Sequence, residues 1–246
     1  MIRFLEVNEY EKAYDFVCDQ LDNTYSSVLS FLKSKLNDFK YLGLFEEDKL
    51  IGLNIFEESD MRIILLIIDN NYQRKGYGKQ LLDYFIKYVS ELHISKVSIN
   101  ALNTAFDFYK KYGFEENGET IEAGAISFIP MEYLVGKENL GKKVEVIVDR
   151  EYGSFHPHLP DVTYELNFGY INDHNQDGEF QDAWIVGVDY PLEKFTGIVI
   201  GIVYHKDDEK SRWLVAPVGY EINHEDIINQ IGFEEQYYDT NIVWTK

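Results

Sequence analysis

The sequence predicts an α+β protein built in two parts, a mixed-sheet region of alternating strands and helices followed by a small β-barrel with one late helix. Three observations support this fold class. The first half alternates apolar runs of strand length with amphipathic helical patterns. The second half consists of short strand-like runs separated by turn residues, with a helical pattern near its end. The 246 residues are enough for two ordinary domains.

Strand and helix patterns follow one another through the first half. We expect helices where apolar residues recur every three or four positions, over 11–21, 27–36, 79–92 and 104–112. Gly113 stands where a glycine commonly ends a helix. We expect strands over 3–7, 41–46, 49–56, 61–68 and 96–101, and two more around 124–133. The run 61–68 is nearly all apolar, which is typical of a strand covered on both faces.

The pattern changes between residues 136 and 141, a polar segment that is flanked by glycines and has no periodicity. We therefore expect a domain over 1–135, a linker over 136–141 and a barrel domain over 142–246. The expected elements of the barrel domain are strands over 144–149, 162–171, 183–188, 197–204 and 213–218, and a helix over 225–237.

Composition restricts the partners and the compartment. The chain has 43 acidic and 23 basic residues, a net charge of −20 that repels nucleic acid and anionic membranes. No apolar stretch approaches the roughly 20 residues that span a bilayer, and the first ten residues lack the pattern of a signal peptide. The single cysteine, Cys18, excludes an internal disulfide, and we interpret it as a buried small hydrophobe. These features predict a cytoplasmic protein without nucleic-acid or membrane partners.

A glycine-bearing loop between the apolar run 61–68 and the next helix carries the strongest functional signal. Gly76 and Gly78 allow the main chain to approach a ligand closely. The amides at the start of the following helix then point towards one spot, where the helix dipole adds partial positive charge. Arg74, Lys75 and Lys79 surround this spot. A glycine pair before a helix is often a simple turn, but this combination predicts an anion site suited to a pyrophosphate.

Two motifs place this loop in a family context. The loop reads Gln-x-x-Gly-x-Gly over Gln73–Gly78, and about thirty residues later Asn103 precedes Ala-x-x-Phe-Tyr-x-x-x-Gly-Phe, which ends at Phe114. Together they resemble the coenzyme A motifs of the GNAT superfamily of N-acetyltransferases, over about residues 1–135. The resemblance implies an acyl-CoA N-acyltransferase fold that uses acetyl-CoA.

Site residues follow from that resemblance. It implies that the main chain at Leu66 and Ile68 pairs with the pantetheine arm and that Asn103 hydrogen-bonds the cofactor. It implies that Tyr109 protonates the departing thiolate. The resemblance also implies that the pyrophosphate is held by Gln73, Arg74, Lys75, Gly76, Tyr77, Gly78 and Lys79.

The acceptor side of the reaction is less defined by sequence. The resemblance implies a small-molecule or peptide amine, and the acidic balance favours a cationic one. Glu57, Glu58 and Asp60 lie where the family often places a base, but each is better explained as a solvated loop charge, and none of them is selected. Tyr25, Glu46 and Glu57 are candidates for lining an acceptor pocket, without a preference among them.

The second half carries an acidic loop whose carboxylates could bind a hard cation such as Mg²⁺, although by itself the loop is better explained as a solvated one. The loop, the strand Asn167–Ile171 and the segment Tyr204–Asp208 resemble parts of soluble inorganic pyrophosphatases, whose barrel is OB-like. That resemblance implies Mg²⁺ ligands at Asp177, Glu179, Asp182 and Asp207. Glu179, Phe180 and Phe168 depart from the usual residues of that family, which argues against efficient hydrolysis.

The leading hypothesis is an N-acetyltransferase that transfers acetyl from acetyl-CoA to a primary amine, with the barrel used for substrate selection, homodimer formation or a second activity. One alternative is a Mg²⁺-dependent inorganic diphosphatase in the barrel domain. The other is a binding module for coenzyme A and phosphate without turnover. Tyr109 favours the enzyme, because a binding module needs no leaving-group acid.

Overall fold

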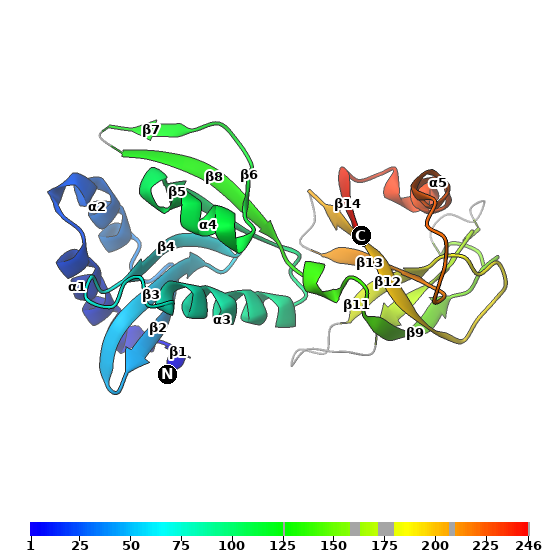
Figure 1. Cartoon of the computed structure of the whole chain (residues 1–246), viewed down its shortest axis with the longest axis horizontal. Helices are drawn as coiled ribbons and strands as arrows, with labels where there is room; N and C mark the ends of the chain where they lie inside the picture. Colours follow the sequence, from blue (N-terminus) through cyan, green and yellow to red (C-terminus); the bar gives the residue numbers. More distant parts are fainter. Residues whose placement is uncertain (125, 158–162, 172–179, 207–209, 246) are drawn as a thin grey trace. The chain divides into compact units, whose positions relative to one another are not determined.

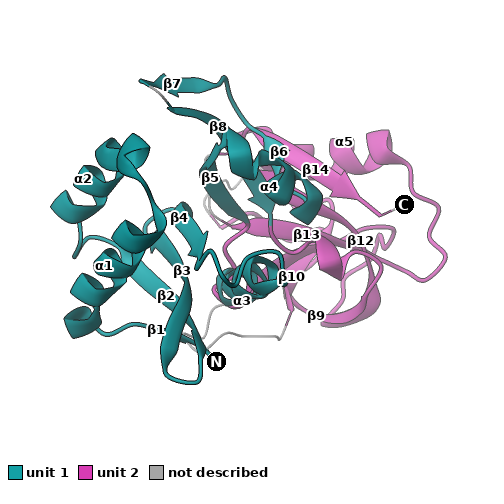
Figure 2. Ribbon diagram, turned by 60° about the vertical axis from the view of Figure 1, so that its left-hand side comes forward, with its two compact units in different colours: residues 1–89, 96–134 teal, residues 90–95, 135–246 magenta. Residues whose placement is uncertain are grey.

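The computed structural model describes residues 1–124, 126–157, 163–171, 180–206 and 210–245. The chain divides into two compact units, one made of Met1–Val89 and Lys96–Leu134 and the other of Ser90–Ser95 and Val135–Lys246 (Figure 2). Each unit has its own sheet and its own apolar core. The first unit carries the glycine-bearing loop and Tyr109.

The first unit contains an eight-stranded mixed sheet in the order β1-β2-β3-β4-β5-β8-β6, with β7 also paired to β8. Only β4 and β5 run parallel, and all other pairs are antiparallel. The strands are β1 (Ile2–Phe4), β2 (Lys40–Glu46), β3 (Lys49–Glu57), β4 (Arg62–Ile68), β5 (Lys96–Leu102), β6 (Glu115–Glu116), β7 (Ile121–Ala123) and β8 (Ile126–Leu134).

Helices cover both faces of this sheet (Figure 1). The α-helices are α1 (Tyr10–Gln20), α2 (Ser26–Ser34), α3 (Tyr77–Glu91) and α4 (Phe106–Tyr112). The 3-10 turns are η1 (Val7–Glu9), η2 (Asn23–Tyr25) and η3 (Asn103–Ala105). Gly113 ends α4 with a φ of 116°, and its amide donates to the carbonyl oxygens of Tyr109 and Lys110. A glycine is favoured there because a side chain would be strained at that φ.

The side chains of β3 pack into the apolar core on both faces of the sheet. Leu53 and Ile55 pack with Ala13 and Val17 of α1 and with Leu32 of α2. The next residue, Phe56, packs on the opposite face against Phe85 of α3, with ring centroids 4.7 Å apart. Successive strand residues point to opposite faces, so the nearly continuous apolar run of β3 serves both helical layers.

The second unit contains a closed five-stranded barrel. Its ring order is β13-β11-β10-β9-β12, closed by pairing of β12 with β13, and β14 adds to the outer side of β12. The β11–β13 pair is parallel and the other pairs are antiparallel. The elements are η4 (Lys137–Asn139), β9 (Lys143–Arg150), β10 (Asn167–Ile171), β11 (Gln181–Ile185), β12 (Lys194–His205), β13 (Ser211–Ala216), α5 (His224–Glu235) and β14 (Thr240–Trp244).

Two features shape the barrel, namely a close approach between the backbones of β9 and β10 and the packing of helix α5 into the core. At the bulge between Phe168 and Gly169, a Cβ on Gly169 would lie 1.9 Å from the carbonyl oxygen of Ile147, so only glycine fits. Helix α5 begins after Asn223, whose side chain accepts a hydrogen bond from the amide of Asp226. Ile227 and Ile231 of α5 are buried in the barrel core beside Trp184, Val203 and Leu214.

Most of the predicted elements are present, with some differences. Two strands were predicted around 124–133, but of the described strands only β8 lies there, and β6 and β7 precede it. The predicted strand 162–171 is shorter, because within the described residues β10 begins only at Asn167. Strand β14 was not predicted, since Thr240–Trp244 is a short run at an edge where it pairs only with β12. Cys18 is half-buried rather than buried. None of the described helices has the length and apolarity needed to cross a bilayer.

Candidate functional site

Strands β4 and β5 separate soon after they meet. Their parallel pairing is limited to Arg62 with Ser98 and Ile63 with Ile99, although β4 continues to Ile68 and β5 to Leu102. A register shift in the β3–β4 pairing leaves Ile64 as an extra residue on β4. Such a bulge bends the strand that carries it. The sheet therefore opens between the carboxyl ends of β4 and β5.

The main chain of β4 faces this opening at alternate residues. The amide of Asp69 donates to the carbonyl oxygen of Ile51, and the register pairs Ile67 with Leu53. In an antiparallel ladder the residues between such pairs direct their amides and carbonyls away from the partner strand. Leu66 and Ile68 therefore direct their main-chain groups away from β3, towards the side where β5 has separated.

The loop after β4 is held by Asp69 and Gln73. Oδ1 of the buried Asp69 accepts from the amide of Asn71 at 2.9 Å, and Lys49 donates to Oδ2 at 3.0 Å. These contacts, the amide of Asn71 first, hold the pKa of Asp69 below its ordinary value. The side-chain amide of Gln73 donates to the carbonyl oxygen of Ile68 at 3.1 Å and to Oδ1 of Asn70 at 2.9 Å. Both side chains fix the turn at the end of β4.

The loop then presents unpaired amides at the start of α3. Arg74 and Gly76 adopt left-handed φ angles of 59° and 86°. The first helical bond of α3 runs from the amide of Gln80 to the carbonyl of Gly76. Within the described part of the chain, the amides from Gln73 to Lys79 have no hydrogen-bond acceptor. Successive unpaired amides at a helix start form a concave site that suits an anionic group such as a diphosphate.

Two of the three cationic side chains of the loop, Lys75 and Lys79, have partners of their own. Nζ of Lys75 donates to the carbonyl of Asn71 at 3.0 Å, and Lys79 forms an ion pair with Asp83 at 2.7 Å. Both ammonium groups stay on the exposed side of the loop. Lys79 and Asp83 are exposed enough that solvent screens their interaction, so their pairing holds neither charge firmly.

Tyr109 lies at the opening between the strands. It is 3% exposed and lines a small cavity of about 60 Å³ together with Leu66 of β4 and Leu102 of β5. Burial raises the pKa of the Tyr109 phenol, because the phenolate would lose its hydration. Among the described residues its hydroxyl has no hydrogen-bond partner. The side chain is therefore a protonated donor that remains available to a group in this cavity.

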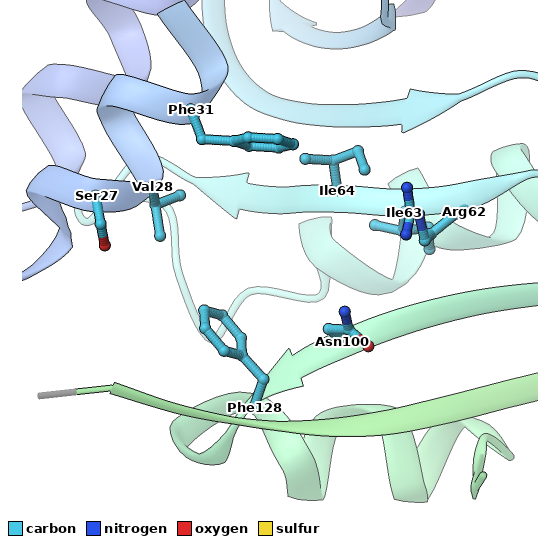
Figure 3. Close-up of a pocket in the computed structure, with 8 residues that line it drawn as sticks. All are labelled: Ser27, Val28, Phe31, Arg62, Ile63, Ile64, Asn100 and Phe128. Carbon is cyan, nitrogen blue, oxygen red and sulfur yellow. The ribbon is translucent and has the colours of Figure 1, made fainter. Parts of the chain in front are cut away.

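A larger cavity adjoins the first one (Figure 3). It measures about 260 Å³ and shares four lining residues with the smaller cavity, namely Val28, Ile64, Asn100 and Phe128. Its remaining lining residues are Ser27 and Phe31 of α2 and Arg62 and Ile63 of β4. Figure 3 shows Arg62 and Asn100 at the end where the strands pair, with Phe31 and Phe128 towards the other end. Two adjoining cavities at one strand opening can hold two reactants beside each other.

The acidic residues considered as bases all take part in ion pairs. Glu57 accepts a short hydrogen bond from Nη2 of Arg62, and Asp60 lies 3.9 Å from Nε of the same guanidinium. Glu58 lies 3.4 Å from Nζ of Lys40. None of these three carboxylates lines the two cavities. Among the pocket candidates, Tyr25 lines the smaller cavity, whereas Glu46 accepts a hydrogen bond from the Tyr77 hydroxyl at 3.1 Å.

Sequence reasoning missed all eight lining residues of the larger cavity. Asn103 begins the turn η3 and is exposed, whereas the nearby Asn100 lines both cavities. Phe31 is 43% exposed on α2 and Phe128 lies on β8, far away in sequence. An exposed aromatic residue on an amphipathic helix was the one available signal, and it does not identify a pocket without the fold.

Only one of the four predicted metal ligands lies within the described residues. Asp177, Glu179 and Asp207 lie outside the described residues. Asp182 lies on β11, where it is half-buried and pairs across the sheet with Tyr170. No group of three or more carboxylate, histidine or cysteine side chains that could hold a metal occurs in the parts of the chain that the structure describes. The Mg²⁺ site and the pyrophosphatase likeness stay predictions, while the closed barrel itself is present.

Part of the chain is similar in sequence to a known acetyltransferase. The chain is 36% identical over 95 residues to the spermine/spermidine N(1)-acetyltransferase of Bacillus subtilis, an alignment that covers 33% of this chain and 62% of that protein. The chain thus spans less than two thirds of that relative's length.

Solved structures of acetyltransferases match at low identity. Ard1 from Thermoplasma volcanium has 20% identity and a TM-score of 0.42, covering 55% of this chain and 97% of that one. A GNAT family acetyltransferase from Elizabethkingia anophelis, solved with acetyl-CoA bound, has 18% identity and a TM-score of 0.38, covering 43% of this chain and 82% of that one.

A family model gives the assignment. The model for the acetyltransferase (GNAT) domain matches residues 12–135, about half of the chain. The match spans the strand opening, the glycine-bearing loop and Tyr109. This chain therefore belongs to the GNAT acetyltransferase family.

Proposed function

We propose that the first unit transfers the acetyl group of acetyl-CoA to a primary amine by direct attack. The observation that carries this proposal is the hydroxyl of the buried Tyr109, which has no hydrogen-bond partner among the described residues and lies beside the opening between β4 and β5. A phenol in this position supplies a proton to a departing thiolate. The adjoining larger cavity offers room for the amine.

The described residues suit the parts of acetyl-CoA by their chemistry. The unpaired amides at Gln73–Lys79 would hold the diphosphate. The main-chain groups of Leu66 and Ile68 would accept and donate hydrogen bonds to the amides of the pantetheine arm, as an added strand does. Asn103 stays a candidate for a further contact to the cofactor. Acetyl-CoA supplies the thioester when it is bound. The chain binds and orients this cofactor, and Tyr109 protonates the departing thiolate.

The reaction balances without an additional reactant. A bond forms between the amine nitrogen and the acetyl carbonyl carbon, and the carbon–sulfur bond of the thioester breaks. The amine releases one proton to solvent, and the thiolate gains one from the Tyr109 hydroxyl, whose phenolate then takes up a proton from solvent, so the products are an amide and coenzyme A with a free thiol. The curated relative is named for spermine and spermidine. Aliphatic polyamines therefore belong in any acceptor panel alongside amino acids and peptides.

The test measures thiol release from acetyl-CoA with this panel, alongside calorimetric titration of coenzyme A. Coenzyme A binding and amine-dependent thiol release by the wild type, with release lost in Tyr109→Phe, would support the proposal. Coenzyme A binding with only background release for every acceptor would point instead to a binding module. Absence of coenzyme A binding would remove the basis of the proposal.

A further inference from the structure

The walls of the larger cavity restrict which amines fit it. Five of its lining residues are apolar, namely Val28, Phe31, Ile63, Ile64 and Phe128. Two of these are phenylalanines, which Figure 3 shows towards one end of the cavity. Its volume of about 260 Å³ lies near the lower end of the roughly 300–1,000 Å³ found for small-molecule sites. A compact, ring-sized apolar group fits such a space better than a long flexible chain.

Arg62 supplies the only charge among the lining residues of this cavity. Its Nη2 donates to Glu57, whereas its Nε is buried without a hydrogen-bond acceptor and lies 3.9 Å from Asp60. A guanidinium carries five N–H donors in a planar fork, so donors remain for another partner. A carboxylate or carbonyl oxygen satisfies such donors, while a second ammonium group does not.

Asn100 adds a neutral polar group at the same end (Figure 3). It is exposed and lines both cavities, so it borders the place where a bound amine meets the thioester side. The acidic residues Glu57 and Asp60 contact the guanidinium of Arg62 but are not among the lining residues of the cavity. Its wall therefore offers no carboxylate to a protonated polyamine, and it places a cation where the far ammonium of a polyamine would lie.

We infer that the acceptor is a compact primary amine with an aromatic or branched apolar body and a carboxylate or carbonyl oxygen that Arg62 binds, as in an apolar α-amino acid or its amide. This inference rests on the proposed acetyl transfer and names its substrate class. It departs from the polyamines in the name of the curated relative. The apolar body occupies the end with Phe31 and Phe128, and the oxygen lies towards Arg62.

The test compares kcat/KM for L-phenylalanine, L-phenylalaninamide, phenethylamine, glycine and spermidine at fixed acetyl-CoA. We expect the two amines that have both a ring and an oxygen to exceed each of the other three by about tenfold or more, because each of the others lacks at least one of the two interactions. Comparison of L-phenylalanine with L-phenylalaninamide shows whether Arg62 prefers a carboxylate or a carbonyl oxygen of the acceptor. Faster turnover of spermidine than of either phenylalanine compound would overturn the inference.

Two variants test the role of Arg62, and they should change the use of L-phenylalanine in opposite directions. Arg62→Gln should lower kcat/KM about tenfold for L-phenylalanine and leave phenethylamine nearly unchanged, because only the former uses the guanidinium. Glu57→Gln removes the carboxylate that shares the charge of Arg62, so KM for L-phenylalanine should fall. Equal losses for both amines in Arg62→Gln, together with an unchanged or higher KM in Glu57→Gln, would assign Arg62 a structural role and overturn the inference.

Calorimetry with coenzyme A separates this inference from the proposed function. If coenzyme A binds and spermidine is the preferred acceptor, only the substrate class is wrong. If coenzyme A binds and none of the five amines is acetylated, the inferred class is overturned as well. If coenzyme A does not bind, the proposed function fails first and the inference fails with it. Thermal unfolding of each variant checks that the cavity is still folded.

Discussion

The side-chain amide of Gln73 donates a hydrogen bond to the carbonyl oxygen of Ile68 at 3.1 Å. This contact joins the loop before α3 to the last residue of β4. The carbonyl that accepts it belongs to one of the two residues whose main-chain groups face the strand opening. The loop amides and the exposed main chain of β4 therefore keep a fixed relation to each other.

Removal of this contact should weaken cofactor binding more than it slows the chemistry. In Gln73→Ala the loop loses hydrogen bonds to Ile68 and Asn70, and we expect the Kd for coenzyme A to rise by about fivefold to tenfold, the equivalent of one hydrogen bond. Calorimetric titration measures the change. Gln80→Ala, an exposed position within the first turns of α3, serves as the control and should bind coenzyme A normally. Equal affinity in the two variants would contradict this role of Gln73.

Gly76 should matter for binding beyond its effect on stability. Its φ of 86° is strained for any side chain, so Gly76→Ala should cost about 1 kcal/mol of unfolding free energy. Gly141 has a similar φ of 81°, and no atom lies within 4 Å of its potential Cβ or that of Gly76. Gly141→Ala should therefore lose comparable stability. Only the change at Gly76 should reorient the loop amides and weaken coenzyme A binding, and a matching loss of affinity at Gly141 would show that the effect is not local.

Tyr109→Phe removes one hydroxyl and should lower kcat by about 10²-fold, with little change in KM for acetyl-CoA. The nearby Tyr112 donates to Asp83 at 2.9 Å and does not line either cavity, so Tyr112→Phe is the matched control. Steady-state kinetics distinguish the two. A Tyr109→Phe enzyme with full kcat would show that another group protonates the thiolate.

The pH profile offers a further check on Tyr109. A general acid acts in its protonated form, and burial raises the pKa of this phenol above the ordinary tyrosine value of about 10. Between pH 6 and about 10, kcat should therefore not fall with rising pH through deprotonation of Tyr109. A limb of the wild-type profile that descends below pH 9 and disappears in Tyr109→Phe would contradict this assignment.

A buried ion-pair network in the second unit should control its stability. Glu235 is 5% exposed and accepts hydrogen bonds from Arg212 at 2.6 Å and from the indole of Trp184 at 3.1 Å, and it lies 2.7 Å from Nε2 of His205. Burial opposes the ionised form, but His205 and Arg212 outweigh it and hold the pKa of Glu235 below its ordinary value. Glu235→Leu leaves Arg212 buried without this partner and should cost about 3–5 kcal/mol.

The neighbouring Glu234 provides the comparison. It lies 3.1 Å from Arg212 but is more exposed, and burial raises its pKa. Its ionised form is thus disfavoured in the folded state, and Glu234→Gln should change the unfolding free energy by less than about 1 kcal/mol. Urea unfolding of both variants measures the difference. Equal losses of unfolding free energy in the two variants would mean that Glu234 and Glu235 contribute equally to holding Arg212.

The lowered pKa of Glu235 also predicts how the stability of the second unit changes with pH. The unfolded glutamate has an ordinary pKa near 4.3, so the stabilisation is complete above that value. It is lost as pH falls towards the folded-state pKa, because the carboxylate must then take up a proton. Unfolding of the wild type between pH 7 and pH 3 should show this loss, and the slope should be smaller in Glu235→Leu.

The sequence by itself determined most elements of the first unit and the glycine-bearing loop. These features depend on local patterns, namely the apolar period of α1 and α3, the apolar run of β4, and glycines at positions 76 and 113 where left-handed φ angles occur. The number of the barrel strands and their approximate positions in the sequence were also predicted for the same reason. Strand β14 was missed because its structure depends on an edge pairing with β12 rather than on its own residues.

Only the tertiary structure decided what surrounds the acceptor side. The larger cavity brings together side chains from α2, β4, β5 and β8, which lie up to about one hundred residues apart in the chain. No local pattern distinguishes Arg62 or Phe128 from ordinary strand residues, since their function depends on where β4 and β5 separate. That separation follows from the bulge at Ile64 and the short β4–β5 pairing, which are properties of the assembled sheet.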